Sequence, residues 1–166
     1  MKKKIIISID GFSSCGKSTL AKAMAKALEY VFVDTGAMYR AIALYFLRNN
    51  IAFNDTASIE AALNAIELRF RYNSVSQKSD MYLNGENVEQ EIREMKVSQK
   101  VSEVASIAAV RDFAVAQQQA MGIDKGIVMD GRDIGTVVFP NAELKLFVTA
   151  DPAIRLERRY QELLQT

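Results

Sequence analysis

A chain of 166 residues, 49% hydrophobic and 25% charged, is long enough for one domain with a substantial core and too short for two. Its 21 basic and 20 acidic side chains leave a net charge of +1, which argues against a general nucleic-acid or membrane binder. The single cysteine excludes an internal disulfide, and the absence of histidine excludes imidazole-based metal sites and acid–base catalysis.

The first apolar run, residues 5–9, follows three lysines but is too short for the core of a signal peptide. No stretch approaches the length of a membrane span. We therefore expect a soluble cytoplasmic protein with no membrane or nucleic-acid partner and no obligate protein partner. The run is β-branched with little polar alternation, which is typical of a central strand in a parallel sheet.

A loop and a helix follow this strand. The loop covers residues 11–16, and the helix is expected from about residue 17 to residue 28. The apolar residues predicted to share one side of it are Leu20, Met24, Ala27 and Leu28. A short second strand at 31–33 ends at Asp34, and a second helix begins near Gly36. The apolar residues at helical spacing in that helix are Met38, Ile42, Tyr45 and Phe46.

The middle of the chain has a different pattern. Residues 67–72 and 81–83 alternate with a period of two, and Asn84-Gly85 is a strong signal for a tight turn, so we expect a small antiparallel sheet with one wet face. Helical spacing returns at about residues 89–105 and again at about 110–121. The residues predicted to point inward from the first of these helices are Ile92, Val97, Val101 and Val104.

Buried-strand patterns then resume at residues 127–129, which end at Asp130, and at residues 144–148. Asp151-Pro152 is a typical helix start. Strands that alternate with helices predict an α/β fold, a parallel sheet with flanking helices and right-handed crossovers. The core would comprise about residues 1–50 and 106–166, and a small α+β insert would occupy about residues 51–105.

Residues 11–18 match the phosphate-binding pattern G-x-x-x-x-G-K-[ST] in full. Gly11 and Gly16 allow the loop to curl so that its backbone N–H groups surround phosphate oxygens, and the next helix aims its positive end at them. Lys17 is then expected to reach the β and γ phosphates of ATP, and Ser18 to offer a hydroxyl to Mg²⁺. The residues assigned to ATP binding are Gly11, Ser13, Ser14, Cys15, Gly16, Lys17, Ser18 and Thr19.

The alternative is a Gly/Ser-rich surface turn with an exposed lysine. The strand directly before the loop and the helix directly after it favour the phosphate loop. Cys15 lies inside this loop, where a helix N-terminus can activate a thiol. We interpret it as a small residue that fills a position without contacts, and assign no chemical role to its thiol.

Two further clusters lie where predicted strands end, the edge at which ligands bind in open α/β sheets. After the second strand, Arg40 can offer a planar fork to an acceptor phosphate; the alternative is an ordinary helix arginine in solvent. After the third, Asp130 fits the acidic residue that holds Mg²⁺ or its water. Arg132 could neutralise the acceptor phosphate, and Asp133 could accept a hydrogen bond from an exocyclic amine such as that of cytosine. The alternative for this cluster is a polar turn.

These segments together resemble bacterial cytidylate kinase, a P-loop NTPase of the nucleoside-monophosphate kinase type. The similar stretches are residues 9–11, 34–40 and 130–140, and the likeness runs in order over nearly the whole chain. The stretch Asp-Gly-Arg-Asp-x-Gly-Thr-Val-Val-Phe-Pro at 130–140 is far more specific than the phosphate loop.

The resemblance implies transfer of the γ-phosphoryl group of ATP to CMP or dCMP, with Mg²⁺, and makes the insert an NMP-binding subdomain. It makes Lys17, Arg40, Asp130 and Arg132 the catalytic residues. Thr35, where the family commonly has serine, would line the CMP pocket. The other residues implied to bind CMP are Tyr39, Arg40, Ser102, Arg111, Arg132 and Asp133, of which Ser102, Arg111 and Asp133 would recognise cytosine.

The resemblance fails at the C-terminus, because chains of this family continue into the rest of a lid and a last strand. Arg155, Arg158 and Arg159 match only the beginning of the lid, and a solvated basic helix face explains them equally well. We therefore expect a truncated chain with an exposed apolar edge at its fourth strand and slow turnover. A nucleotide-binding module without turnover is the alternative. A GTPase switch would need an Asn-Lys-x-Asp segment, which the sequence lacks.

Overall fold

The structure of the protein, a computed structural model, describes residues 3–73 and 78–164. The chain divides into two compact units. The first unit comprises Met1–Thr35 and Gln117–Thr166, and the second comprises Gly36–Ala116. The predicted boundaries of the core and the insert, and the role of the insert, remain predictions.

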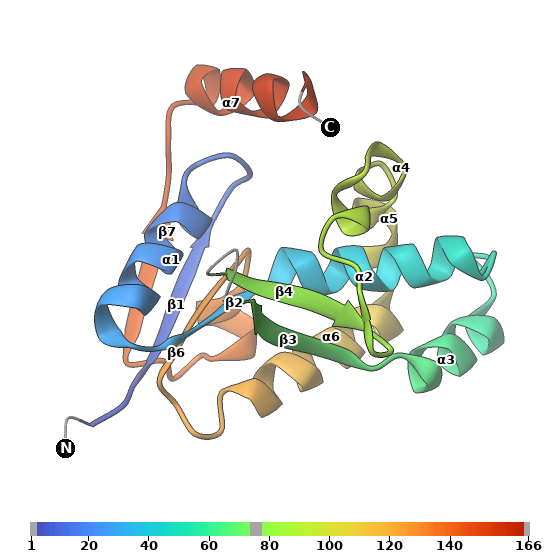
Figure 1. Ribbon diagram of the computed structural model, residues 1–166, viewed down its shortest axis with the longest axis horizontal. Helices are drawn as coiled ribbons and strands as arrows, with labels where there is room; N and C mark the ends of the chain where they lie inside the picture. The colour runs from blue at the N-terminus through green and yellow to red at the C-terminus, as the bar shows by residue number, and fades with distance from the viewer. Residues whose placement is uncertain (1–2, 74–77, 165–166) are drawn as a thin grey trace. The chain divides into compact units, whose positions relative to one another are not determined.

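The first unit is built on a four-stranded sheet, drawn as arrows in Figure 1, with the strand order β2-β6-β1-β7. All three strand pairs are parallel, as the continuous apolar runs predicted. The strands are β1 (Ile6–Gly11), β2 (Val31–Asp34), β6 (Ile127–Gly131) and β7 (Leu144–Val148). Because the strands are parallel, their carboxyl ends share one edge, which collects the residues that follow β1, β2 and β6.

Helix α1 (Lys17–Leu28) packs on this sheet with a different face from the one predicted. Its buried residues are Ala21 and Ala25, which join Ile7, Ile9 and Val128 in a core cluster. Leu20, Ala27 and Leu28 are exposed and Met24 is partly buried, so the side on which these residues were predicted to gather is not the side that is buried on the sheet. The physical reason is size, since two alanines one turn apart let the helix backbone approach the sheet closely.

Strand β7 lies at an edge of the sheet, as expected for the fourth run. Leu144, Leu146 and Val148 pack partly against the core, whereas Phe147 is 64% exposed. The Phe147 ring makes an edge contact with Phe12, at 5.8 Å between centroids. The last helix, α7 (Pro152–Leu164), begins where Asp151-Pro152 predicted, and Asp151 accepts a hydrogen bond from the Ala153 N–H at 2.8 Å.

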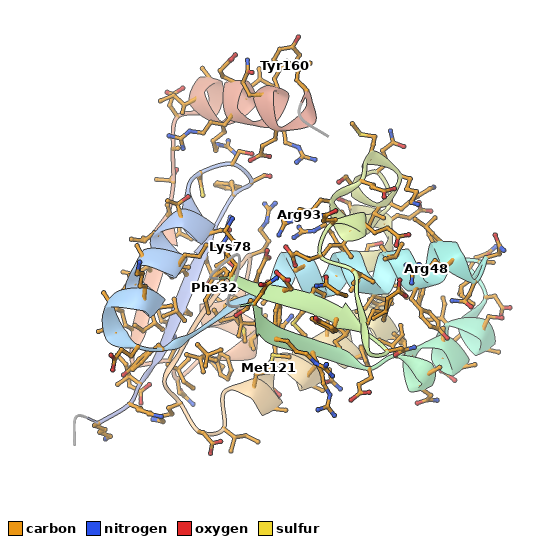
Figure 2. All side chains as sticks on the ribbon, in the orientation of Figure 1. Phe32, Arg48, Lys78, Arg93, Met121 and Tyr160 are labelled. Carbon is orange, nitrogen blue, oxygen red and sulfur yellow. The ribbon has the colours of Figure 1, made fainter. Side chains whose placement is uncertain are left out.

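The second unit combines helices with a small antiparallel sheet in the order β3-β4-β5. The alternation correctly predicted the antiparallel pairing of β3 with β4, and the predicted Asn84-Gly85 turn lies between β4 and β5. Arg48, labelled in Figure 2, makes ion pairs with Glu86 and Glu91, so it ties its helix to the hairpin region. The elements of this unit are α2 (Thr35–Arg48), α3 (Thr56–Ala65), β3 (Leu68–Asn73), β4 (Lys78–Leu83), β5 (Glu86–Asn87), η1 (Glu91–Arg93), α4 (Met95–Ser98) and α5 (Val101–Ala105). Helix α6 (Ala108–Met121) continues from it into the first unit.

The single helix predicted at 89–105 is wrong, because the chain forms three short turns there, η1, α4 and α5. Ile92, Val97 and Val104 are nevertheless all fully buried, as predicted, whereas Val101, predicted to point inward with them, is only partly buried. Residues five apart, such as Ile92 and Val97, do not share a face of one continuous α-helix. Breaking the helix lets both side chains turn inward.

Two elements had not been anticipated. Helix α3 starts at an Asp55 N-cap, whose carboxylate accepts from the Ser58 N–H at 3.2 Å, and it buries Ile59 and Leu63. After β6, residues Ile134–Val138 form η2, one turn of π-helix. Such turns are uncommon and recur at functional sites, so residue propensity alone does not predict them.

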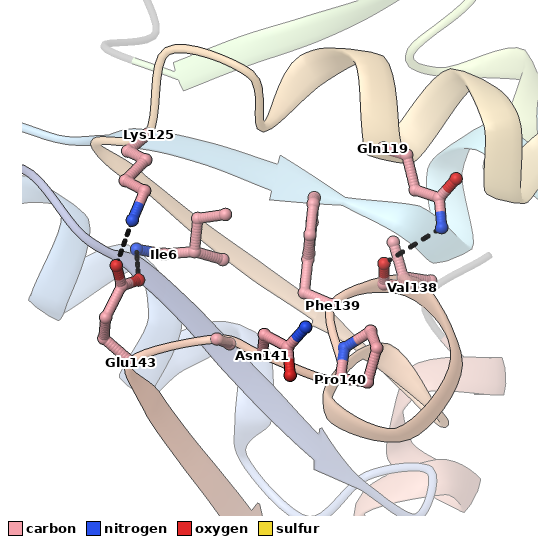
Figure 3. A pocket seen from close by; sticks show the side chains of 9 residues that line it. Ile6, Gln119, Lys125, Val138, Phe139, Pro140, Asn141 and Glu143 are labelled. Atoms are coloured by element: carbon pink, nitrogen blue, oxygen red, sulfur yellow. Dashed lines mark hydrogen bonds and ion pairs between the residues drawn. The ribbon is translucent and has the colours of Figure 1, made fainter.

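A cavity of about 370 Å³ lies at the amino-terminal edge of the sheet in the first unit (Figure 3). Beside it, the Glu143 carboxylate accepts a hydrogen bond from the Ile6 N–H at 2.9 Å and pairs with Lys125. The backbone hydrogen bond first, and then Lys125, lower the pKa of Glu143 to about 2. None of the nine residues that line this cavity belongs to the predicted ATP or CMP sites.

We predict that Glu143→Gln lowers the melting temperature at neutral pH. A carboxyl whose pKa is depressed on folding stabilises the fold above its usual pKa, and this contribution is lost as pH falls towards the folded value. The difference between wild type and variant should therefore shrink between about pH 4.5 and pH 2. Thermal unfolding followed by circular dichroism measures it, with Glu60→Gln on α3 as the matched control. A difference that is constant with pH would contradict the prediction.

Candidate functional site

The loop between β1 and α1 has the curled backbone that a phosphate site requires. Gly11 and Gly16 have φ values of +149° and +93°, and Ser14 between them has a φ of +55°. The Lys17 ammonium group folds back over the loop and donates to the Phe12 carbonyl oxygen at 2.6 Å. A positive group, curled backbone and a helix N-terminus thus meet at one place.

Gly11 is also required by space. A Cβ atom there would lie 2.1 Å from the Val148 carbonyl oxygen of the neighbouring strand. We predict that Gly11→Ala costs at least about 1–3 kcal/mol of unfolding free energy, because the backbone on one side has to move. Chemical denaturation measures this cost. Gly85→Ala is the control. Gly85 also has a positive φ, but a Cβ atom added there would meet no neighbouring side chain or backbone within 4 Å. Equal costs at the two positions would show that φ alone, and not the β1–β7 contact, determines the need for glycine.

The Ser18 hydroxyl donates to the Asp130 carboxylate at 2.5 Å, which links the start of α1 to the end of β6. Asp34, at the end of β2, is the register partner of Asp130. Two carboxylates and a hydroxyl are therefore held together at the carboxyl edge of the sheet. Burial first, and then the charge of Asp34, raise the pKa of Asp130 to about 6.

These residues suit a divalent cation that is shared with a nucleotide. Within the part of the chain that the structure describes, Oδ1 of buried Asp130 has no hydrogen-bond partner. In the same residues no cluster of three or more acidic or thiol side chains forms a complete metal site. Mg²⁺ is usually bound by one or two carboxylates together with substrate phosphates and water, so the incomplete donor set fits it.

The loop after β6 carries Arg132 and Asp133 and is packed tightly. The Thr35 hydroxyl donates to the Asp130 carbonyl oxygen at 2.7 Å. A Cβ atom on Gly131 would lie 2.8 Å from that hydroxyl oxygen and 2.6 Å from a methyl carbon of Ile134. Arg132 is exposed and Asp133 is partly buried, so the loop presents an arginine and a carboxylate from a fixed backbone.

The residues predicted to bind CMP fall into two sets. Thr35, Arg132 and Asp133 belong to the first unit, where the contacts above bring Thr35 against the loop after β6. The second unit carries Tyr39 and Arg40 on α2, Ser102 on α5 and Arg111 on α6. That both sets bind one CMP molecule stays a prediction.

Helix α7 contacts the phosphate loop, although its face away from the loop is exposed, including Tyr160 at 56% (Figure 2). The Arg158 guanidinium donates to the Ser14 carbonyl oxygen at 3.5 Å. The guanidinium carbon of Arg155 lies 4.9 Å from the centroid of the Phe12 ring. Arg159 instead pairs with Glu162 at 3.1 Å on its own helix. Two of the three arginines of this helix are therefore at the loop.

The sequence pattern that defines the family described as Cytidylate kinase matches residues 7–166. This chain belongs to the cytidylate kinase family. It is 58% identical to the cytidylate kinase of Bacteroides thetaiotaomicron over 97% of its own length and 72% of that protein. The corresponding protein of Flavobacterium johnsoniae is 60% identical over 98% of this chain and 72% of its own length. That of Porphyromonas gingivalis is 54% identical, with the same two shares of 98% and 72%.

Membership of the cytidylate kinase family confirms the resemblance seen in the phosphate loop and in residues 130–140. It also agrees with the parallel sheet and the small antiparallel sheet. Among residues 3–73 and 78–164, no helix has both the length and the apolar character needed to cross a bilayer.

Sequence reasoning gave no role to two carboxylates that the structure places at this edge. Asp34 ends the second predicted strand, and in the structure it faces Asp130 through the β2–β6 pairing. Asp10, also at a strand end, is only 8% exposed and accepts backbone hydrogen bonds from η2. A carboxylate at the end of an apolar run is the available signal, but its partners lie more than 90 residues away.

Proposed function

We propose that this protein transfers the γ-phosphoryl group of ATP to CMP or dCMP and forms ADP with CDP or dCDP. An oxygen of the CMP phosphate attacks the γ-phosphorus, and the bond to the β,γ-bridging oxygen breaks, with its electron pair leaving on ADP. Because the attacking oxygen is already anionic, the step needs no general base, in agreement with a sequence without histidine. The observation that carries the proposal is a phosphate loop whose Ser18 hydroxyl is hydrogen-bonded to the Asp130 carboxylate. The chain that carries it belongs to the cytidylate kinase family.

The proposed roles follow from charge and position. Lys17 and the loop amides hold the ATP phosphates, while Arg40 and Arg132 bind the phosphate of CMP. Asp133 accepts a hydrogen bond from the cytosine amine, with Ser102 and Arg111 as further base contacts and Thr35 and Tyr39 lining the pocket. Ser18 and Asp130 would hold Mg²⁺, Asp130 directly or through water, and the cation would neutralise charge on the β and γ phosphates.

We predict opposite effects of Asp130→Asn on stability and on Mg²⁺. Removing a buried carboxylate that faces Asp34 should raise the melting temperature, because the cost of burying that charge disappears. The apparent affinity for Mg²⁺ in ATP binding should fall by roughly ten- to a hundredfold. Differential scanning fluorimetry and ATP titration over a range of Mg²⁺ concentrations measure the two effects. Unchanged Mg²⁺ dependence would remove Asp130 from the cation site.

Titration calorimetry with CMP, UMP and GMP, each with and without Mg²⁺ and a non-hydrolysable ATP analogue, tests the proposed function. A coupled assay for ADP release completes it. CMP should bind most tightly, and its addition to the protein with Mg·ATP should release ADP. CMP binding without ADP release would indicate a binding module and contradict phosphoryl transfer, and binding of GTP alone would indicate a switch protein.

A further inference from the structure

Asp10 holds the loop that carries Arg132 and Asp133. Its two carboxylate oxygens accept the backbone N–H groups of Ile134 and Gly135 at 2.7 and 2.8 Å. Asp10 is the second-to-last residue of β1, and its side chain is buried. A buried carboxylate whose two oxygens each meet a backbone donor makes a pair of charge-assisted hydrogen bonds, stronger than neutral ones.

These two N–H groups are the first of the π-turn η2. The first N–H groups of a helical turn have no acceptor within the turn and need one from elsewhere. The residue before the turn is Asp133, whose carbonyl oxygen accepts the Val137 N–H at 2.8 Å. Within the described residues, the side chain of Asp133 makes no capping bond to its own turn. Asp10 thus supplies the cap of this turn from 124 residues away.

The loop is also confined by close packing around Gly135. A Cβ atom at Gly135 would lie 2.7 Å from the Ser8 hydroxyl oxygen and 3.2 Å from a carboxylate oxygen of Asp10. At its other end, the turn is held by Gln119, whose side-chain amide donates to the Val138 carbonyl oxygen at 3.2 Å. The turn is therefore fixed against β1 at its start and against α6 at its end.

We propose that Asp10 is a positioning residue. By holding the turn η2 in place, it orients the Asp133 carboxylate towards the base of the acceptor nucleotide. Asp10 touches neither substrate in this assignment and acts only through the backbone of the turn. Its effect should therefore fall on base selectivity, which depends on the direction of one carboxylate. Binding of ATP to the phosphate loop does not depend on that direction. The inference rests on the proposed role of Asp133 in recognising cytosine.

Asp10→Asn tests it, because the amide keeps one acceptor and turns a donor towards the other N–H. We expect the ratio of CMP to UMP affinity to fall by about tenfold, by analogy with the loss seen when the hydrogen-bond partner that orients a metal ligand is removed. ATP affinity should stay the same. The double variant with Asp133→Ala should lose no more selectivity than Asp133→Ala alone, because the two residues act in series.

Two controls separate positioning from loss of stability. Val138→Ala opens a cavity at a buried position of the same turn, so it should lower the melting temperature without changing the ratio. Ser8→Ala removes the hydroxyl beside Gly135 and should not change the ratio. Gly135→Ala should displace the Gly135 N–H from the Asp10 carboxylate by a change in the turn itself. It is the test to use if Asp10→Asn does not fold.

The outcomes distinguish the inference from the function beneath it. If Asp133→Ala leaves the CMP to UMP ratio unchanged, the assignment of Asp133 to the base is wrong. If Asp133→Ala lowers the ratio and both Asp10→Asn and Gly135→Ala leave it unchanged, the positioning role is wrong while the function stands. Equal losses of ATP and CMP affinity in Asp10→Asn would show that Asp10 acts through the neighbouring phosphate loop, which also overturns the inference.

Discussion

Replacing Lys17 with alanine should lower the rate of CDP formation by about a hundredfold to a thousandfold, as happens when one preorganised donor to transition-state charge is removed. The Lys17 ammonium group is the only side-chain cation in the sequence of the phosphate loop. In the proposed reaction it contacts the γ-phosphoryl group while negative charge develops on the oxygen that leaves with ADP. Its present contact with the Phe12 carbonyl oxygen places it at the mouth of that loop.

Steady-state rates over a range of ATP and CMP concentrations measure the effect, and titration with an ATP analogue gives the loss of ground-state binding. Lys26→Ala is the matched control, since it removes the same charge from the last turn of the same helix. The melting temperature should stay close to that of wild type, because Lys17 is only partly buried and its ammonium contacts lie within its own loop. If Lys17→Ala and Lys26→Ala have equal rates, the loop is not the phosphoryl-donor site.

Asp133→Ala should reduce the preference for CMP over UMP by roughly tenfold to a hundredfold, since a good hydrogen-bonded contact to a base edge is worth about 1–3 kcal/mol of discrimination. A carboxylate accepts from the amine of cytosine but repels the carbonyl oxygen that uracil has in its place. The ratio should therefore fall for two reasons: the variant should bind CMP more weakly and UMP more tightly than wild type.

Competition titrations of the two nucleotides against the same protein sample measure this ratio directly. Asp124→Ala provides the control, because Asp124 is an exposed aspartate of the same unit. An unchanged ratio in Asp133→Ala would leave Ser102 and Arg111 as the remaining candidates for reading the base.

The phosphate loop could be predicted from sequence because its chemistry is local. The residues it needs lie close together in the chain: Gly11, Gly16, Lys17 and Ser18. Each is required for its backbone freedom, its charge or its hydroxyl group, and these properties depend on residue type and not on distant contacts. The strand before the loop and the helix after it were predicted at nearly the observed bounds, residues 6–11 and 17–28. The parallel sheet followed from apolar runs without alternation, which only a strand covered on both faces tolerates.

Helix faces and short turns were less predictable, because they depend on what packs against them. Helix α1 presents Ala21 and Ala25 to the sheet rather than its larger leucines, since the sheet surface favours close approach. The region 89–105 breaks into three turns to bury Ile92, Val97 and Val104 together. Local propensity predicts neither the buried face of α1 nor the breaks in residues 89–105, because the free energy gained by tertiary packing outweighs it.

The sequence by itself determined the fold class, the phosphate loop and the family, because each depends on residues that are adjacent or follow a fixed period. Only the tertiary structure decided that Asp34 faces Asp130 and that Asp10 caps the turn after Asp133. These pairings join residues that are 96 and 124 positions apart along the chain, Asp34 with Asp130 and Asp10 with Ile134. Strand order brings them together, and strand order is set by the burial of the whole sheet rather than by any local signal.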